Sequence, residues 1–212
     1  MTPDSAQDGR SARRERSRAA IIDAVFALVQ EGKVPPHVDD VADRAGVSVS
    51  TIFRSFDGVP DMQHQALESF QPKFQHLFTV DDAGRARTER IRSHVQTRVE
   101  LFGVAGGLMR IGRARALDHE PMVEGLARLR ARLAAQTRQR FHVELDQLTP
   151  AEAANLGALI DATTSPEAYD IMSASHSRTP RQIARTWTSA LDVLLSHSER
   201  CTPTRTDDKE LT

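Results

Sequence analysis

The sequence is poor in the residues that build disulfides, strands and membrane spans. Cys201 is its only cysteine, so no disulfide can form within the chain. Aromatic residues make up only 5% of the chain, while alanine, leucine and arginine are frequent, and this mixture favours helices over strands. No apolar run approaches the roughly 20 residues that cross a bilayer, and no apolar stretch typical of a signal peptide follows the start of the chain. We therefore expect an all-α, cytoplasmic protein without contact to a membrane.

The chain also lacks an overall excess of positive charge. Its formal net charge is -1, which gives no general sign of nucleic-acid binding. Arginine is nevertheless concentrated in two places. The first is a cluster with a single acid, Glu15, which is either a solvated tail or a DNA contact; it consists of Arg10, Arg13, Arg14, Arg16 and Arg18. The second runs from Arg85 to Arg140, where the arginines most simply form the exposed faces of helices, with a site for an anionic effector as the alternative.

Apolar residues recur at helical spacing in about nine segments, separated by glycine and proline. The first helix is expected to begin near Ala12 or Ser17 and to end at Gly32. A Gly-rich junction at Gly103, Gly106 and Gly107 is expected to interrupt the middle of the chain, and Thr149 to Glu152 forms a capping box. The expected organisation is a flexible arm (1–11), a DNA-binding domain (12–59), an effector-binding and dimerisation bundle (60–200) and a disordered tail (201–212).

The span from His37 to Phe56 contains two short amphipathic helices joined by a tight turn at Gly46. This is the arrangement of a helix-turn-helix, whose second helix lies in the major groove of DNA. That second helix has Ser48 as its expected N-cap, and the residues expected to face outward are small or polar and include no acid: Ser48, Val49, Ser50, Thr51, Arg54 and Ser55. Such a face suits a polyanionic groove, because it offers hydrogen-bond donors without repulsion. The alternative is an ordinary helical hairpin inside a bundle.

Two short stretches resemble the TetR family of bacterial regulators: Val41-Ala42-Asp43-Arg44-Ala45-Gly46-Val47-Ser48 and Ser50-Thr51-Ile52-Phe53-Arg54-Ser55-Phe56. The resemblance is strong only from about Ser17 to Met62. It implies a homodimeric repressor with an N-terminal three-helix DNA-binding domain and a C-terminal bundle whose pocket, once filled by a small molecule, causes release of DNA.

Two positions depart from that family's pattern. The family usually carries a tyrosine where this chain has Phe53, and a lysine where it has Val59, and both usual residues contact backbone phosphate. Each lost contact is expected to lower the salt dependence of DNA binding by about one unit of slope. The departures motivate a rival interpretation, a helical ligand-binding or interaction protein with weakened DNA binding.

The expected sites follow from these interpretations. The DNA contacts are predicted to be Arg14, Arg18, His37, Val38, Ser48, Val49, Ser50, Thr51, Phe53 and Arg54, and Phe53 is equally expected to pack in the core. The walls of a pocket for an apolar or amphipathic effector are predicted to be Met62, Phe70, Phe74, Phe102, Met109, Met122 and Leu126, although the same residues would also fill a solid core. Two subunits are predicted to pair through the last helix and the one that carries Ala154, Gly157, Ala158 and Ala162, and to bind near-palindromic double-stranded DNA.

No motif predicts catalysis, a cofactor or a metal. The glycines from Gly107 to Gly112 are followed by Arg113-Ala114 instead of the Lys-Ser/Thr that ends a phosphate-binding loop. Asp118-His119-Glu120 most simply forms a solvated turn rather than a metal site. An all-helical enzyme that uses an inner cavity is the weakest alternative.

Overall fold

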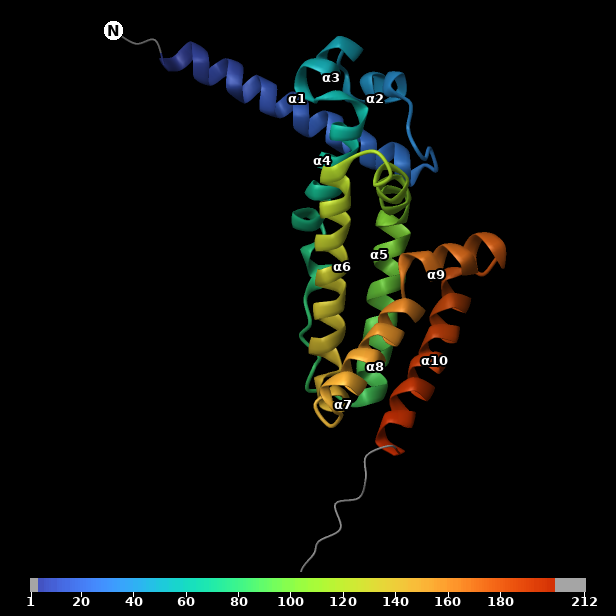
Figure 1. The fold of residues 1–212 in the computed structure, drawn as a ribbon. Coiled ribbons are helices and arrows are strands. Elements are labelled where there is room, and N and C mark those ends of the chain that lie inside the picture. The colour runs from blue at the N-terminus through green and yellow to red at the C-terminus, as the bar shows by residue number, and fades with distance from the viewer. Residues whose placement is uncertain (1–3, 201–212) are drawn as a thin grey trace, which may run out of the picture. The chain divides into compact units, whose positions relative to one another are not determined.

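The computed structural model describes residues 4–200, and every regular element in that range is helical, which confirms the expected all-α fold (Figure 1). The elements are α1 (Asp4–Gln30), α2 (Val38–Ala45), α3 (Val49–Ser55), α4 (Gly58–Lys73), η1 (Gln75–Phe78), α5 (Arg87–Arg115), α6 (Glu120–Arg140), α7 (His142–Leu145), α8 (Pro150–Thr163), α9 (Pro166–Asp170), η2 (Ile171–Ser175) and α10 (Pro180–Arg200). Within residues 4–200, no helix has both the length and the apolar character needed to cross a membrane. Cys201 and the predicted tail (201–212) lie outside the described residues.

The chain packs as two compact units. Unit 1 comprises Met1–Leu77 and Leu101–Ala131, and unit 2 comprises Phe78–Glu100 and Arg132–Thr212. The long helices α5 and α6 each contribute a segment to both units. The packing therefore does not follow the linear order of the expected domains, and the boundary at residues 59 and 60 stays a prediction.

The first three helices of unit 1 form because their start and stop signals agree with their apolar faces. Gly46 ends α2 in the left-handed conformation, with φ of 66°, which glycine adopts without strain. Two residues later the Ser48 hydroxyl accepts a hydrogen bond from the backbone N–H of Thr51 at 3.2 Å and caps α3, as the sequence predicted. Ile52, on the inner side of α3, is fully buried. The first helix differs from expectation, because it begins at Asp4 rather than near Ala12 or Ser17.

The predicted break at Gly103, Gly106 and Gly107 is wrong, because α5 runs without interruption from Arg87 to Arg115. The glycine at 107 serves close packing instead of a turn. A Cβ atom at Gly107 would lie 2.3 Å from Cγ1 of Val29 on α1, closer than real Cβ contacts come. Gly107 therefore lets α5 and α1 approach each other closely within unit 1. Glycine is a poorer helix former than alanine, so this close approach reduces the intrinsic stability of α5.

Unit 2 is held by well-capped helices around its own core. Thr149 and Glu152 form the predicted capping box at the start of α8, and the Ser165 hydroxyl caps α9. Thr179 and Gln182 exchange the same pair of hydrogen bonds at the start of α10. The helices α8 and α10 pack together, and the buried apolar side chains on them include Ile160, Ile183, Trp187 and Leu191.

The seven predicted pocket residues all belong to unit 1, and six of them are buried. The Phe70 and Phe74 rings stack with centroids 4.5 Å apart, and Phe26 lies 6.2 Å from Phe70. A Cβ atom at Gly112 would approach Leu126 to 3.2 Å and Met122 to 3.5 Å. These distances show close packing around Phe70 and around Gly112. Effector contact by Met62, Phe70, Phe74, Phe102, Met109, Met122 and Leu126 stays a prediction.

Candidate nucleic-acid interface

The outer face of α3 carries a connected set of hydroxyl groups. The Ser48 hydroxyl lies 2.9 Å from both the Ser50 hydroxyl and the Thr51 hydroxyl. Arg54 donates to the Thr51 hydroxyl at 3.1 Å, which holds its guanidinium along the helix. Ser48, Ser50 and Arg54 are exposed, and α3 contains no acidic residue. This face can donate hydrogen bonds to phosphates and base edges without opposing negative charge.

A groove between α1 and α3 adds positive charge beside that face. It has a volume of about 480 Å³, and arginines and hydroxyl residues line it: Arg13, Arg14 and Ser17 from α1, and Thr51, Arg54 and Ser55 from α3. Three guanidiniums beside three hydroxyls are a set of donors suited to phosphate. The structure thus brings the predicted contacts Arg14, Thr51 and Arg54 together and adds Arg13 and Ser17. Their sequence signal is the spacing of 13, 14 and 17, which puts all three on one side of a helix.

Arg18 has partners within the protein. Its guanidinium donates to the Ser55 backbone carbonyl and to the Gln65 side-chain oxygen, and it lies 4.7 Å from the centre of the Phe56 ring. These contacts join α1 to α3 and α4. DNA contact by Arg18 stays a prediction, and it requires the guanidinium to leave these partners.

On α3 the apolar Phe53 is exposed and the polar Ser55 is buried, the opposite of what the polarity of the two side chains suggests. Phe53 is 52% exposed, so the structure favours the expectation of an outward side chain over packing in the core. Ser55, expected to face outward, is only 6% exposed, because Arg18 and α1 cover it. The outward face of α3 therefore presents an aromatic ring next to its hydroxyl groups.

His37 and Val38 lie at the N-terminus of α2, and two acidic residues follow them in the first turn of that helix. His37 is exposed and Val38 is half-buried. The first turn of α2 carries Asp39 and Asp40, and Asp40 forms an ion pair with Lys33 at 3.2 Å. Since carboxylates repel phosphate, DNA contact at His37 and Val38 has less support from the structure than contact at α3. It stays a prediction.

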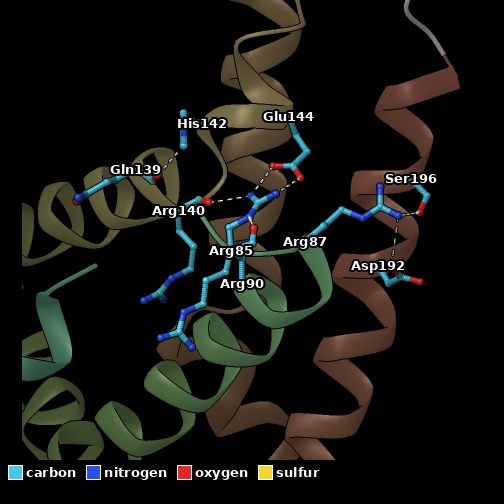
Figure 2. A network of polar contacts seen from close by, with 9 residues as sticks. All are labelled: Arg85, Arg87, Arg90, Gln139, Arg140, His142, Glu144, Asp192 and Ser196. Carbon is cyan, nitrogen blue, oxygen red and sulfur yellow. Dashed lines mark hydrogen bonds and ion pairs between the residues drawn. The ribbon is translucent and has the colours of Figure 1, made fainter. Parts of the chain in front are cut away.

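Unit 2 contains a second concentration of charge, and this one is buried. The predicted exposure of the arginines from Arg85 to Arg140 is wrong for three of them, because Arg90 is 3% exposed and Arg98 and Arg140 are each 1% exposed. Figure 2 shows Arg90 held between the Arg140 backbone carbonyl, at 2.9 Å, and the Glu144 carboxylate, at 2.6 and 2.7 Å. Arg140 in turn donates from Nε to Asp82 at 3.0 Å.

His94 lies within the same buried cluster. Burial, together with the positive charges of Arg98 and Arg140, lowers the pKa of His94 well below 6.5, so its ring is neutral. The Thr164 hydroxyl donates its proton to the Ile160 carbonyl at 2.8 Å, so its oxygen accepts the bond from His94 Nε2 at 3.1 Å. His94 Nδ1 is then an unprotonated acceptor.

No group of three or more histidine, cysteine, aspartate or glutamate side chains within residues 4–200 is arranged to hold a metal ion. The turn at Asp118-His119-Glu120 falls in this range. His119 instead lies against the ring of His64, with centroids 5.9 Å apart.

Comparison with known proteins identifies the fold. No protein-family model and no curated protein matches the sequence. Several solved structures match the three-dimensional arrangement. One from Rhodococcus sp., classed as a TetR-family transcriptional regulator, has a TM-score of 0.65 at 18% identity and covers 84% of this chain and 98% of its own. A transcriptional regulator from Rhodococcus sp. Rha1 has a TM-score of 0.61 at 21% identity, covering 87% and 96% respectively. One from Mesorhizobium loti, also classed as TetR-family, has a TM-score of 0.59 at 16% identity, covering 87% and 98%. The chain therefore has the fold of TetR-family transcriptional regulators.

Proposed function

We propose that the chain is a sequence-specific regulator of transcription that binds double-stranded DNA through α3 and the groove between α1 and α3. The observation that carries this proposal is the groove itself, where Arg13, Arg14 and Arg54 meet the hydroxyls of Ser17 and Thr51 beside an acid-free helix. The arginines supply phosphate contacts that fix the position on the duplex, and α3 supplies the side chains that read base edges.

The proposed assembly is a homodimer that pairs through α8 and α10. Support comes from apolar side chains that unit 2 leaves in solvent, Leu159 on α8 at 53% exposure and Val193 on α10 at 66%. Ala154, Ala158 and Ala162 are exposed along α8 at intervals of four residues, which gives a partner helix a flat surface. Two symmetric copies of α3 would read two half-sites about one helical turn apart, so the operator is expected to be near-palindromic.

The proposed mode of control is repression relieved by a small molecule. A ligand that binds one conformation of the dimer more tightly than the other shifts the population towards it, and DNA affinity falls only by that difference. The TetR-like fold motivates this part of the proposal.

The DNA-binding proposal is tested by selecting fragments from a genomic library and measuring retention at several salt concentrations. Arg13→Gln with Arg14→Gln is expected to reduce the slope of log affinity against log salt by about 3.6 units, since the dimer loses four phosphate contacts and each contributes about 0.9. The matched control removes two exposed arginines of unit 2, Arg178→Gln with Arg181→Gln, and is expected to leave the slope unchanged.

Replacing α3 side chains tests base reading, and the loss of Arg54, which also lines the groove, is expected to lower the salt slope as well. Ser50→Ala with Thr51→Ala and Arg54→Gln is expected to abolish selection of the preferred fragment over random DNA. If the wild-type protein retains no fragment at low salt, the rival holds, and the protein is a ligand-binding or interaction protein. The exposed Phe53, which has no phosphate-binding hydroxyl, is the observation that favours that rival.

The dimer is tested by sedimentation velocity. Leu159→Asp is expected to give a monomer that keeps its helical circular dichroism, because the side chain is already exposed within one chain. Leu117→Asp is the matched control, since Leu117 is 90% exposed in unit 1 and is expected to stay in the dimer. A wild-type protein that sediments as a monomer at all concentrations would contradict the proposal.

A further inference from the structure

The buried arginine cluster of unit 2 has three unpartnered hydrogen-bond donors against two unpartnered acceptors, Oδ2 of Asp82 and Nδ1 of His94. Arg90 is well satisfied, because two oxygens of Glu144 and two backbone carbonyls accept from it. Arg98 and Arg140 are different. Nε and Nη1 of Arg98 and Nη1 of Arg140 are buried without a hydrogen-bond partner. A buried guanidinium that lacks acceptors is unfavourable, because it has lost its water without replacement.

Arg98 is the least satisfied member of the cluster. Its Nη2 donates to the Leu133 carbonyl at 2.9 Å and to the Thr137 hydroxyl at 3.2 Å. The carboxylate of Asp161 lies 3.5 Å from the same nitrogen, well beyond the roughly 2.7–2.9 Å of a strong charged hydrogen bond. The Asp161 side chain is 30% exposed, and its Oδ1 also accepts a hydrogen bond from the Thr137 hydroxyl at 2.5 Å, so a ligand that displaces Asp161 has to replace it at Thr137 as well. Burial lowers the pKa of Arg98 to about 10, and the group still carries its charge at neutral pH.

The unsatisfied groups are neighbours. Arg98 follows His94 by one turn of α5. Arg140 directly precedes Phe141, whose ring lies 5.3 Å from the His94 ring. The site therefore combines the free donors of two guanidiniums with an aromatic wall, between α5 and α6 within unit 2.

We propose that this cluster is the binding site for the carboxylate of a small organic acid, which displaces Asp161 and accepts from Arg98 and Arg140. The inference rests on the proposed function, since the acid would be the effector of the regulator. It identifies the chemical class of the effector as a monocarboxylate with an apolar or aromatic body. It also places the site in unit 2, whereas the seven predicted pocket residues belong to unit 1.

The test measures thermal unfolding of the full chain with acetate, benzoate and octanoate, each compared with its primary amide at equal ionic strength. At least one acid is expected to raise the melting temperature with a saturable concentration dependence, while its amide does not. Arg98→Gln is expected to remove the response. Arg87→Gln, whose side chain contacts Ser196 and Asp192 on α10 (Figure 2), is the matched control on the same helix and is expected to keep it.

Asp161→Asn supplies a change in the opposite direction. It removes the competing carboxylate, so it is expected to tighten binding of the acid by about threefold or more. A buried ion cluster with a purely structural role gives no such gain. The proposal is overturned if all three acids act like their amides, if Arg98→Gln keeps the response, or if Asp161→Asn weakens binding. Should Arg98→Gln not fold, the Asp161→Asn result decides alone.

DNA retention by the ligand-free protein separates this inference from the proposed function. If the protein selects a DNA fragment but no acid binds, the effector class is wrong and the regulator stands. If an acid binds but no fragment is retained at low salt, the site stands as that of a ligand-binding protein.

Discussion

The two units bury their side chains by different physical means. The core of unit 1 is built from apolar groups such as Ile21, Met62 and Phe70, each at most 1% exposed. Unit 2 buries Phe141 and Trp187, but it also buries three arginines with two carboxylates, those of Asp82 and Glu144. Apolar burial has no direction, whereas a buried ion depends on each of its partners. Unit 2 is therefore expected to be the more sensitive to the loss of a single polar atom.

Removing one partner of the buried ion pair is expected to have the largest effect. Glu144→Ala leaves Arg90 charged and without its carboxylate, and is expected to reduce the free energy of unfolding by about 3–5 kcal/mol. The matched control is Glu68→Ala, because Glu68 pairs with Arg128 at 2.9 Å on the surface of unit 1, and its loss is expected to change stability by about 1 kcal/mol at most. Urea denaturation followed by circular dichroism measures both. Equal losses would show that burial does not distinguish the two pairs.

Adding one methyl group to the apolar core of unit 1 is expected to have the next largest effect. Gly107→Ala places Cβ 2.3 Å from Val29, and is expected to destabilise by about 1–3 kcal/mol. Gly103→Ala is the matched control on the same helix, because nothing lies within 4 Å of its Cβ position. Without that crowding, alanine is the better helix former, and a gain of about 0.5–1 kcal/mol is expected. Thermal unfolding would contradict this account if both variants changed stability in the same direction.

The sequence predicted local features of the fold well because short-range chemistry determines them. Gly46, Ser48 and the capping box at Thr149 act within four residues, and all three have their predicted roles. The continuous α5 could not be predicted in this way. Glycines normally favour a break, and the reason for Gly107 lies in Val29, which is distant in sequence.

The buried arginines were missed for a similar reason. The partner of Arg90 is 54 residues away, so no local rule reveals the pair. A signal was nevertheless present, because Arg98 occupies the apolar stripe of α5 together with Ile91, Val95 and Phe102. An arginine at such a position indicates a buried charge. Similarly, the exposure of Phe53 could not be predicted from its apolar side chain, because it depends on how α3 packs against its neighbours.

The neutral histidine of unit 2 is expected to give a moderate, pH-dependent effect. Folding lowers the pKa of His94 below 6.5. Below that pH the unfolded chain therefore binds a proton at His94 that the folded chain does not bind. The contribution of His94 to the free energy of unfolding is therefore fully present above pH 6.5. It falls as the pH drops below 6.5, by at most about 1.4 kcal/mol per pH unit. His94→Gln, which can still donate to Thr164, is expected to flatten this part of the curve. Urea denaturation at pH 7.5, 6.5 and 5.5 measures the free energy of unfolding of both proteins. The same pH dependence in the wild type and in His94→Gln would contradict the prediction.

The smallest expected effect on stability lies on the exposed face of α3, where burial plays no part. Because Phe53 is 52% exposed, Phe53→Tyr places its hydroxyl in solvent and is expected to change the free energy of unfolding by less than about 0.5 kcal/mol. If α3 enters the major groove, the added hydroxyl can donate to a phosphate. The slope of log affinity against log salt is then unchanged by this neutral donor, while affinity for every fragment rises to a similar degree, since phosphate contacts carry no base information.

The two departures from the TetR pattern, Phe53 and Val59, are therefore expected to differ in their effect on the salt slope. A hydroxyl carries no charge and releases no counterion, whereas replacing Val59 with lysine adds one cation per subunit and is expected to raise the slope for the dimer by about 1.8. Fluorescence anisotropy on the selected fragment at four salt concentrations distinguishes the two variants. If Phe53→Tyr changed the preference among fragments instead of the overall affinity, residue 53 would contact base edges, and the boundary between reading and positioning residues on α3 would have to be redrawn.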